Sequence, residues 1–237
     1  MLLIKTCWHD AVTLCRGKPE LLAVWLSPDN ANKVAVCLFW IMAGGGLYGA
    51  AIGLWRAPLQ SLYVLLKLPL LIFLTTLGNA LLNGMLAQIL GAKISFRQSA
   101  LAILMSFALA AIILGSLAPL ALMLIYNSPP MGTEYAEVAH HLIILFNVAA
   151  IALAGVSANL SLLRLLAFIT NSDKLARTIL FSWLAVNLLM GGQLAWIMRP
   201  FIGTPDWPVE FFRAKALDGN FFEALLISAR QLMNAND

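Results

Sequence analysis

Five long apolar segments separated by short polar stretches dominate the pattern of the chain. The segments cover residues 34–55, 68–90, 100–126, 142–170 and 178–198. A helix needs about 20 predominantly apolar residues to cross the hydrocarbon core of a bilayer. The pattern therefore predicts five transmembrane helices, the third of them kinked near Pro119. The aromatic residues expected to anchor helix ends at the membrane surface are Trp40, Trp55, Trp183 and Trp196, with Tyr126.

The two ends of the chain carry a mixed, amphipathic pattern instead. Residues 1–33 predict one or two helices lying at the membrane surface, and residues 209–233 predict a similar surface helix, because their charges are too evenly placed for a hydrocarbon core. A further short surface helix is predicted over residues 57–67. The expected organisation is an N-terminal segment over 1–33, a five-helix transmembrane domain over 34–203 and a C-terminal surface helix within 204–237.

Composition makes the membrane assignment firm. Of 237 residues, 61% are hydrophobic and 11% are charged, whereas a soluble domain is about 45–50% apolar and about 25% charged. The sequence therefore predicts an all-α integral membrane protein. The same values argue against a disordered chain and against a nucleic-acid partner, and three cysteines are too few for a disulfide scaffold.

The basic residues set the expected orientation in the membrane. If the N-terminus is cytoplasmic, the cytoplasmic segments carry Lys5, Arg16, Lys18, Lys33, Lys93, Arg97, Lys174 and Arg177. The loop over residues 128–139 has no Lys or Arg and contains Glu134 and Glu137. Since cytoplasmic loops are enriched in Lys and Arg, this loop marks the outer face. We expect a bacterial cytoplasmic (inner) membrane protein with its N-terminus inside.

The connection between the second and third spans carries a family-like pattern. A small-residue-rich span is followed by a Gly-Ala turn, a Ser-Phe-Arg-Gln segment and a span that ends in a proline, formed here by Gly91, Ala92, Ser95, Phe96, Arg97, Gln98 and Pro119. Residues 80–124 thereby resemble the core of the Yip1-domain superfamily, over about a fifth of the chain. The resemblance implies five spans and a cytoplasmic N-terminus. Eukaryotic members of that superfamily are implicated in vesicle trafficking and membrane shaping with small GTPase partners.

The first span contains a glycine repeat. Gly45, Gly49 and Gly53 are spaced by four residues, so they share one face of a helix. Small residues let helix backbones approach closely in a membrane, where lipid leaves no hydrophobic driving force between helices. The repeat predicts close packing, within the chain or between copies, and the alternative is a pore or lipid path lined by bare backbone. Beyond the lipid bilayer, the expected partner is a second copy or another membrane protein.

Polar side chains recur at helical spacing within three spans. They are Thr76, Asn79 and Asn83 in the second span, Ser157, Ser161 and Arg164 in the fourth, and Asn187 and Gln193 in the fifth. Because polar groups at depth must find partners, these faces are expected to meet inside the bundle, as structural glue or as a hydrated path. Arg164 and Lys67 are close enough to span ends to snorkel. The five apolar segments contain no Asp or Glu, which argues against proton- or sodium-coupled transport.

Acidic and histidine residues cluster before the fourth span. Glu137 and His140 have the Glu-x-x-His spacing of di-iron bundles, and His141 follows them. A second such motif and further carboxylates on facing helices are missing from the spans, so a capped, hydrated helix start is the preferred interpretation and a metal or redox subunit the weakest hypothesis. Since no nucleophile elbow, Walker or dinucleotide motif occurs either, we expect no enzyme and no cofactor.

Two functional hypotheses remain. The first is a non-enzymatic membrane scaffold or accessory subunit, which packs through its glycine face against a copy or a partner and uses its terminal helices to grip or shape the bilayer. The second is a channel or transporter for a small solute or lipid, with a path lined by Asn79, Asn83, Ser157, Ser161 and Asn187.

Overall fold

The computed structural model describes residues 2–27, 30, 32–130, 132–203, 208–224 and 226, and every regular element in them is helical. Two short helices come first, α1 (Leu2–Arg16) and α2 (Pro19–Trp25). The first span combines α3 (Asn32–Trp40), the π-helical turn η2 (Ile41–Gly45) and α4 (Gly46–Gly53). The later spans are α5 (Pro58–Ile89), α6 (Phe96–Tyr126), α7 (Ala136–Thr170) and α8 (Asp173–Met198).

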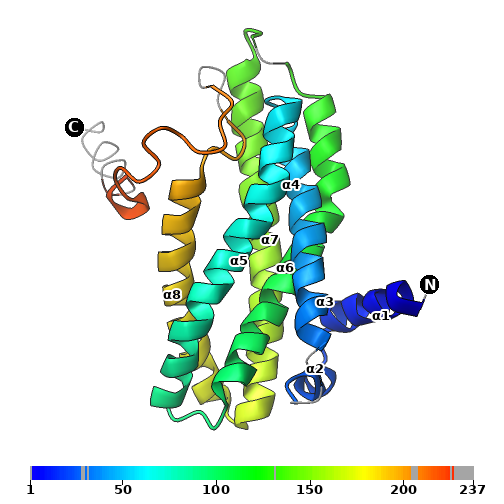
Figure 1. Ribbon diagram of the computed structural model, residues 1–237, viewed down its shortest axis with the longest axis vertical. Helices are drawn as coiled ribbons and strands as arrows, with labels where there is room; N and C mark the ends of the chain where they lie inside the picture. Colours follow the sequence, from blue (N-terminus) through cyan, green and yellow to red (C-terminus); the bar gives the residue numbers. More distant parts are fainter. Residues whose placement is uncertain are drawn as a thin grey trace.

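The structure confirms the five predicted apolar helices. The segment Asn32–Gly53 and the helices α5, α6, α7 and α8 are each long and apolar enough to cross a membrane, and they run side by side along the long axis of the molecule (Figure 1). Large apolar side chains point outward from them, including Leu81, Leu145 and Leu188, which are 56%, 65% and 70% exposed. So much exposed apolar surface indicates an integral, multi-pass membrane protein.

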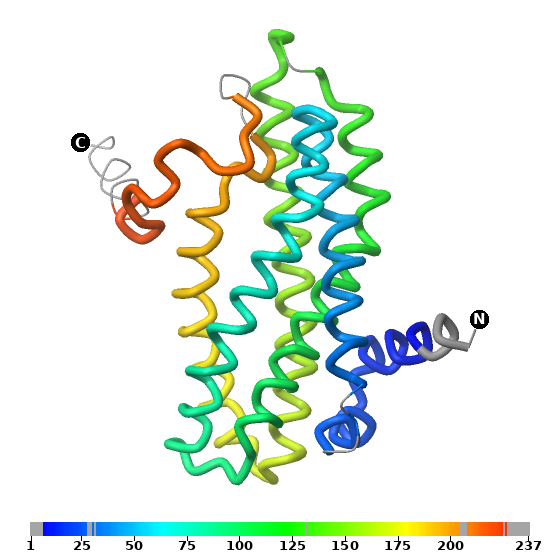
Figure 2. The backbone as a smooth tube through the Cα atoms, in the orientation of Figure 1, coloured from blue at the N-terminus to red at the C-terminus, as the bar shows by residue number. Residues whose placement is uncertain are grey.

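Helix α6 is the centre of the bundle. It packs against α3, η2 and α4 of the first span, and against α5 and α7. Helix α8 stands at one edge, where it contacts α5 and α7 (Figure 1). The N-terminal helices lie toward the end where α5 joins α6 and α7 joins α8, whereas the segment after α8 folds over the opposite end (Figure 2).

The Ser-Phe-Arg-Gln segment begins helix α6. Ser95 Oγ accepts a hydrogen bond from the backbone N–H of Gln98 at 3.2 Å, and Gln98 Oε1 accepts one from the backbone N–H of Ser95 at 2.8 Å. Such a reciprocal capping box satisfies two backbone donors that the first helical turn leaves free. The motif therefore has a local structural role at this helix start.

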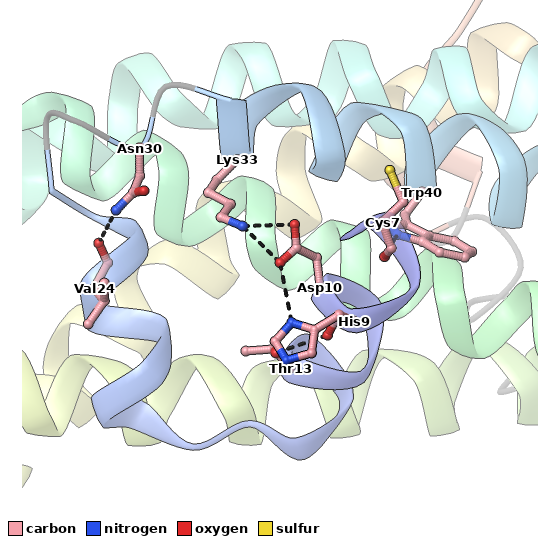
Figure 3. Close-up of polar contacts among 8 residues, drawn as sticks. All are labelled: Cys7, His9, Asp10, Thr13, Val24, Asn30, Lys33 and Trp40. Carbon is pink, nitrogen blue, oxygen red and sulfur yellow. Dashed lines mark hydrogen bonds and ion pairs between the residues drawn. The ribbon is translucent and has the colours of Figure 1, made fainter. Parts of the chain in front are cut away.

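A buried ion pair fastens the N-terminal helices to the first span. Lys33 Nζ lies 2.8 Å from both carboxylate oxygens of Asp10, whose side chain is only 5% exposed (Figure 3). The same ammonium lies 4.7 Å from the centre of the Trp25 ring, and Trp40 Nε1 donates to the backbone oxygen of Cys7 at 3.3 Å. The described part of residues 1–31 thus contains the two helices α1 and α2, within the predicted one or two, and Lys33 already belongs to α3. An ion pair and a hydrogen bond from the Trp40 ring attach α1 to α3.

Breaking this ion pair is expected to expose Cys37. The thiol of Cys37 is fully buried in the cluster that also contains Trp25. Removing one partner of a buried ion pair costs about 3–5 kcal/mol, so Lys33→Met should loosen α1 and raise the rate at which N-ethylmaleimide labels Cys37 by at least about tenfold. Mass spectrometry of labelled peptides separates Cys37 from the other two cysteines. The exposed Lys93→Met is the control, and equal labelling in both variants would contradict the expectation.

The predicted surface helix over residues 57–67 is wrong. Helix α5 runs without a break from Pro58 to Ile89, so these residues are the first turns of the second span. Pro58 starts the helix, where its missing N–H is not needed, and Pro69 lies inside α5 without ending it. Lys67 does not snorkel, because its side chain is fully buried under the segment that follows α8.

The predicted tail helix over residues 209–233 begins too early. Residues 208–220 form bends and turns, and a helical turn starts only at Phe221. Trp196 Nε1 donates to the backbone oxygen of Asp218 at 3.4 Å, and Gln193 Oε1 accepts from the backbone N–H of Phe221 at 3.2 Å. This segment therefore folds back on α8 through backbone contacts that a continuous helix would not offer. Residues 204–207 and 227–237 of the prediction lie outside the described residues.

The glycine repeat packs within the chain. A Cβ atom built on Gly49 or Gly53 would lie within 3.0 Å of the backbone oxygen of Val64 or Gln60 in α5, and one on Gly44 would clash with the backbone of α6. Gly45 is looser, since its Cβ would stand 3.4 Å from the Ile72 side chain. Of the two outcomes predicted for the repeat, the structure places the packing inside the chain. Because α5 already covers this face, a second copy cannot occupy it.

Candidate functional site

A partly open cavity of about 90 Å³ lies between α5, α6, α7 and α8. It lies near the middle of the bundle, since Asn187 is about halfway along α8. A buried water needs at least about 10–15 Å³ by this measure, so the space suits a few waters or a solute of a few heavy atoms. The lining residues are Asn79, Asn83, Ile103, Ser106, Phe107, Ala110, Gly155, Ala158, Asn159, Leu162, Leu180, Trp183, Leu184 and Asn187.

Four asparagines, a serine and a tryptophan give this cavity its polar wall. Asn79 Nδ2 donates to Asn187 Oδ1 at 2.7 Å and thereby links α5 to α8. One turn further along α5, the backbone oxygen of Asn83 accepts from Trp183 Nε1 at 2.9 Å. Asn79 is 0% exposed and Asn83 is 2% exposed. Helix α8 therefore binds the side-chain amide of Asn79 and the backbone of Asn83, and both side chains are buried.

Two amide oxygens at this wall have no hydrogen-bond partner. Asn79 Oδ1 and Asn83 Oδ1 are both buried without a donor within reach among the described residues. A buried acceptor left unpaired costs about 1–3 kcal/mol, and buried polar groups in folded proteins are nearly always satisfied by protein or by ordered water. The two oxygens can therefore accept hydrogen bonds from a water or another donor in the cavity.

The lining favours a neutral ligand. None of its side chains is charged, and its polar groups are amides, one hydroxyl at Ser106 and the indole of Trp183. The amide of Asn159 donates to the backbone oxygen of Gly155 at 2.7 Å, which leaves its own oxygen for another donor. An ion would be costly here, because a charge in a low-dielectric interior needs an opposite charge or a full set of ligands.

Five of the residues predicted to share a polar path lie elsewhere. Thr76 donates to the backbone oxygen of Ile72 at 2.7 Å and faces a separate apolar pocket. On α7, Ser161 lies against Gly17 in the turn between α1 and α2, and Arg164 is exposed. Ser157 is absent from the cavity wall, and Gln193 binds the backbone of the folded-back tail. Only Asn79, Asn83 and Asn187 come together as predicted.

Three polar lining residues, Ser106, Asn159 and Trp183, were not predicted from the sequence to line a path. Helix α7 faces the cavity with Gly155, Ala158, Asn159 and Leu162, about one residue out of step with its predicted serine stripe. The small residues Gly155 and Ala158 beside Asn159 were the sequence signal that could have placed Asn159 on the cavity wall. Ser106 had no polar neighbour at helical spacing, and Trp183, expected at the membrane surface, is instead 2% exposed.

The Glu137, His140 and His141 cluster does not form a metal centre among the described residues. His140 stacks on Trp55 with ring centres 5.5 Å apart, while His141 Nδ1 lies 2.7 Å from the backbone oxygen of Glu137. In the part of the chain that the structure describes, no group of three His, Cys, Asp or Glu side chains is placed to hold a metal ion. These residues act as ring and backbone contacts at the start of α7.

Comparisons with protein-family models, with curated proteins and with solved structures find no match to this chain. The resemblance to the Yip1 superfamily therefore stays a prediction.

Proposed function

We propose that this protein is a non-enzymatic membrane channel or transporter for a small, neutral, polar solute that donates hydrogen bonds. The observation that carries the proposal is the pair of buried, unpartnered oxygens of Asn79 and Asn83 at an uncharged cavity in the middle of the bundle. Polar groups inside a membrane-spanning bundle are costly when they lack a protein partner, and residues that line substrate paths are often of this kind. The size of the cavity restricts the solute to a few heavy atoms.

The structural-glue interpretation accounts for only part of this geometry. Glue explains the bond from Asn79 Nδ2 to Asn187 Oδ1, because that bond joins two helices. It does not explain Asn83, whose side-chain oxygen is buried and binds nothing among the described residues. The scaffold hypothesis also loses support, since the glycine face on which it depended is filled by α5 and α6.

The proposed orientation has the N-terminus in the cytoplasm of a bacterium. Its support is the distribution of basic residues over the short loops between the spans, since Arg199, Arg213 and Lys215 of the tail lie at the opposite end. Exposed basic side chains gather at the end that carries α1 and α2, among them Arg16, Lys18, Lys93, Lys174 and Arg177. The loop from residue 127 to residue 135 at the other end carries no basic residue, as expected for the outer face.

Solute flux into proteoliposomes tests the proposed function. Vesicles that contain the purified full chain are expected to swell or shrink faster than protein-free vesicles in stopped-flow light scattering with water, urea or ammonia, and to stay impermeable to sodium and chloride. The uncharged wall is the reason for this selectivity. Rates equal to those of protein-free vesicles for all three solutes would refute the proposal.

A further inference from the structure

The segment that follows α8 folds back beside the end of that helix (Figure 1). Two arginines, Arg199 and Arg213, come together there over the ring of Trp196. The guanidinium carbon of Arg199 is 3.1 Å from the centre of the Trp196 ring, and that of Arg213 is 5.0 Å from the same centre. A cation over an aromatic face is favourable. Two cations sharing one indole, however, repel each other, so the ring alone does not account for their position.

The two guanidinium groups have buried donors with no acceptor. Arg199 Nε, Arg213 Nε and Arg213 Nη2 are all buried without a hydrogen-bond partner among the described residues. The ion pairs among the described residues all involve Asp10, at the other end of the bundle. No described carboxylate therefore lies within 4.0 Å of the side chain of Arg199 or Arg213. Burial and the charge of Arg213 both lower the pKa of Arg199 from its ordinary value, yet a guanidinium stays charged in proteins.

A third cation holds the tail beside this pair. Lys67 Nζ donates to the backbone oxygens of Pro200 at 3.0 Å and Glu210 at 3.4 Å, and lies 5.1 Å from the centre of the Phe211 ring. These two carbonyls satisfy donors of Lys67 but bring no negative charge. The folded-back tail thus brings Arg199, Arg213 and Lys67 to one end of the bundle without a compensating anion from the described residues.

We infer that Arg199 and Arg213 bind a phosphate group at this end of the bundle. The planar N–H donors of arginine match phosphate oxygens in pairs, and such charge-assisted bonds are about twice as strong as neutral ones. A phosphate would supply acceptors for the three orphaned nitrogens and neutralise the pair. The site lies just past the last residue of a membrane-spanning helix, at the level where lipid headgroups begin. The phosphate therefore comes either from a phospholipid headgroup or from a free phosphate in water. This inference is independent of the central cavity.

Two measurements on the full chain in mild detergent separate the sources. Native mass spectrometry with added phosphatidylglycerol counts retained lipids, and thermal unfolding is followed in inorganic phosphate against potassium chloride of equal ionic strength. A lipid site predicts one more retained lipid in wild type than in the Arg199→Gln/Arg213→Gln variant, with no effect of free phosphate. A free-phosphate site predicts a rise of about 2–5 °C in the wild-type midpoint, lost in the variant.

The exposed Arg177 at the other end of α8 provides the matched control, and Arg177→Gln should behave as wild type in both measurements. If the double variant fails to fold, Arg213→Lys keeps the charge and removes the paired donors, and should weaken binding by about tenfold. The inference is overturned if wild type retains no more lipid than the Arg213→Lys variant and the wild-type midpoint does not respond to phosphate.

Discussion

Gly49→Val is expected to lower the free energy of unfolding by about 3 kcal/mol or more, enough to prevent a stable bundle. A Cβ at Gly49 would lie within 3.0 Å of the backbone oxygen of Val64 in α5, and valine adds two further carbons. A backbone carbonyl inside a helix cannot move aside as a flexible side chain can. The first span and α5 would therefore have to separate along the face on which they pack most closely.

Unfolding of the purified protein in mixed micelles with increasing dodecyl sulfate measures this effect. Gly155→Ala is the control, because no atom lies within 4 Å of its added Cβ and alanine favours a helix by about 0.8–1.0 kcal/mol over glycine. The free energy of unfolding of Gly45→Ala should lie between those of Gly49→Val and Gly155→Ala. If Gly49→Val left the stability of the single chain unchanged and altered only its size in detergent, the glycines would pack copies together and the structure would be contradicted.

Asn83→Leu is expected to raise the free energy of unfolding by about 1–2 kcal/mol. The side-chain oxygen of Asn83 is buried and unpaired, and replacing such a group by an apolar one of similar size removes its desolvation penalty. The bond between Asn83 and Trp183 uses the backbone oxygen of Asn83, so it survives the change. Extra stability gained by removing a polar residue is typical of a functional site.

Asn79→Leu is the matched comparison for that experiment. It removes the hydrogen bond to Asn187 and leaves the Asn187 oxygen unpaired, so it should lower the free energy of unfolding by about 1 kcal/mol or more. If the free energy of unfolding rises in Asn83→Leu and falls in Asn79→Leu, Asn83 is an acceptor for a ligand and Asn79 is a contact that joins two helices. A loss of stability in Asn83→Leu as large as that in Asn79→Leu would mean that both residues are structural glue.

The five spans were predictable because hydropathy is a local property. Each segment is apolar over its own length, and the bilayer thickness sets how long it must be. The errors in the predicted helix boundaries arose where contacts with residues far away in the chain determine the structure. Lys67 suggested an interruption before the second span, but its ammonium is satisfied by the backbone oxygens of Pro200 and Glu210, more than 130 residues away in the chain. No pattern in the sequence around Lys67 predicts a contact with residues so far away in the chain.

The cavity was predictable only in part, since spacing identifies a stripe on a helix but not the direction in which it faces. Asn79, Asn83 and Asn187 meet because α5 and α8 pack along their polar faces. On α7 the serine stripe turns away, and small residues near Asn159 face the cavity instead. The π-helical turn adds a similar uncertainty in the first span, where Gly44 faces α6 while Gly49 faces α5.

The most direct test of the central claim is the rate of solute flux through Asn83→Leu compared with Ser157→Leu. Both residues belong to the polar stripes predicted from sequence, but only Asn83 lines the cavity. In proteoliposomes with equal amounts of folded protein, Asn83→Leu is expected to reduce the flux of water, urea or ammonia to the level of protein-free vesicles, while Ser157→Leu keeps the wild-type rate. Wild-type flux through Asn83→Leu would contradict the assignment of this cavity as the solute path.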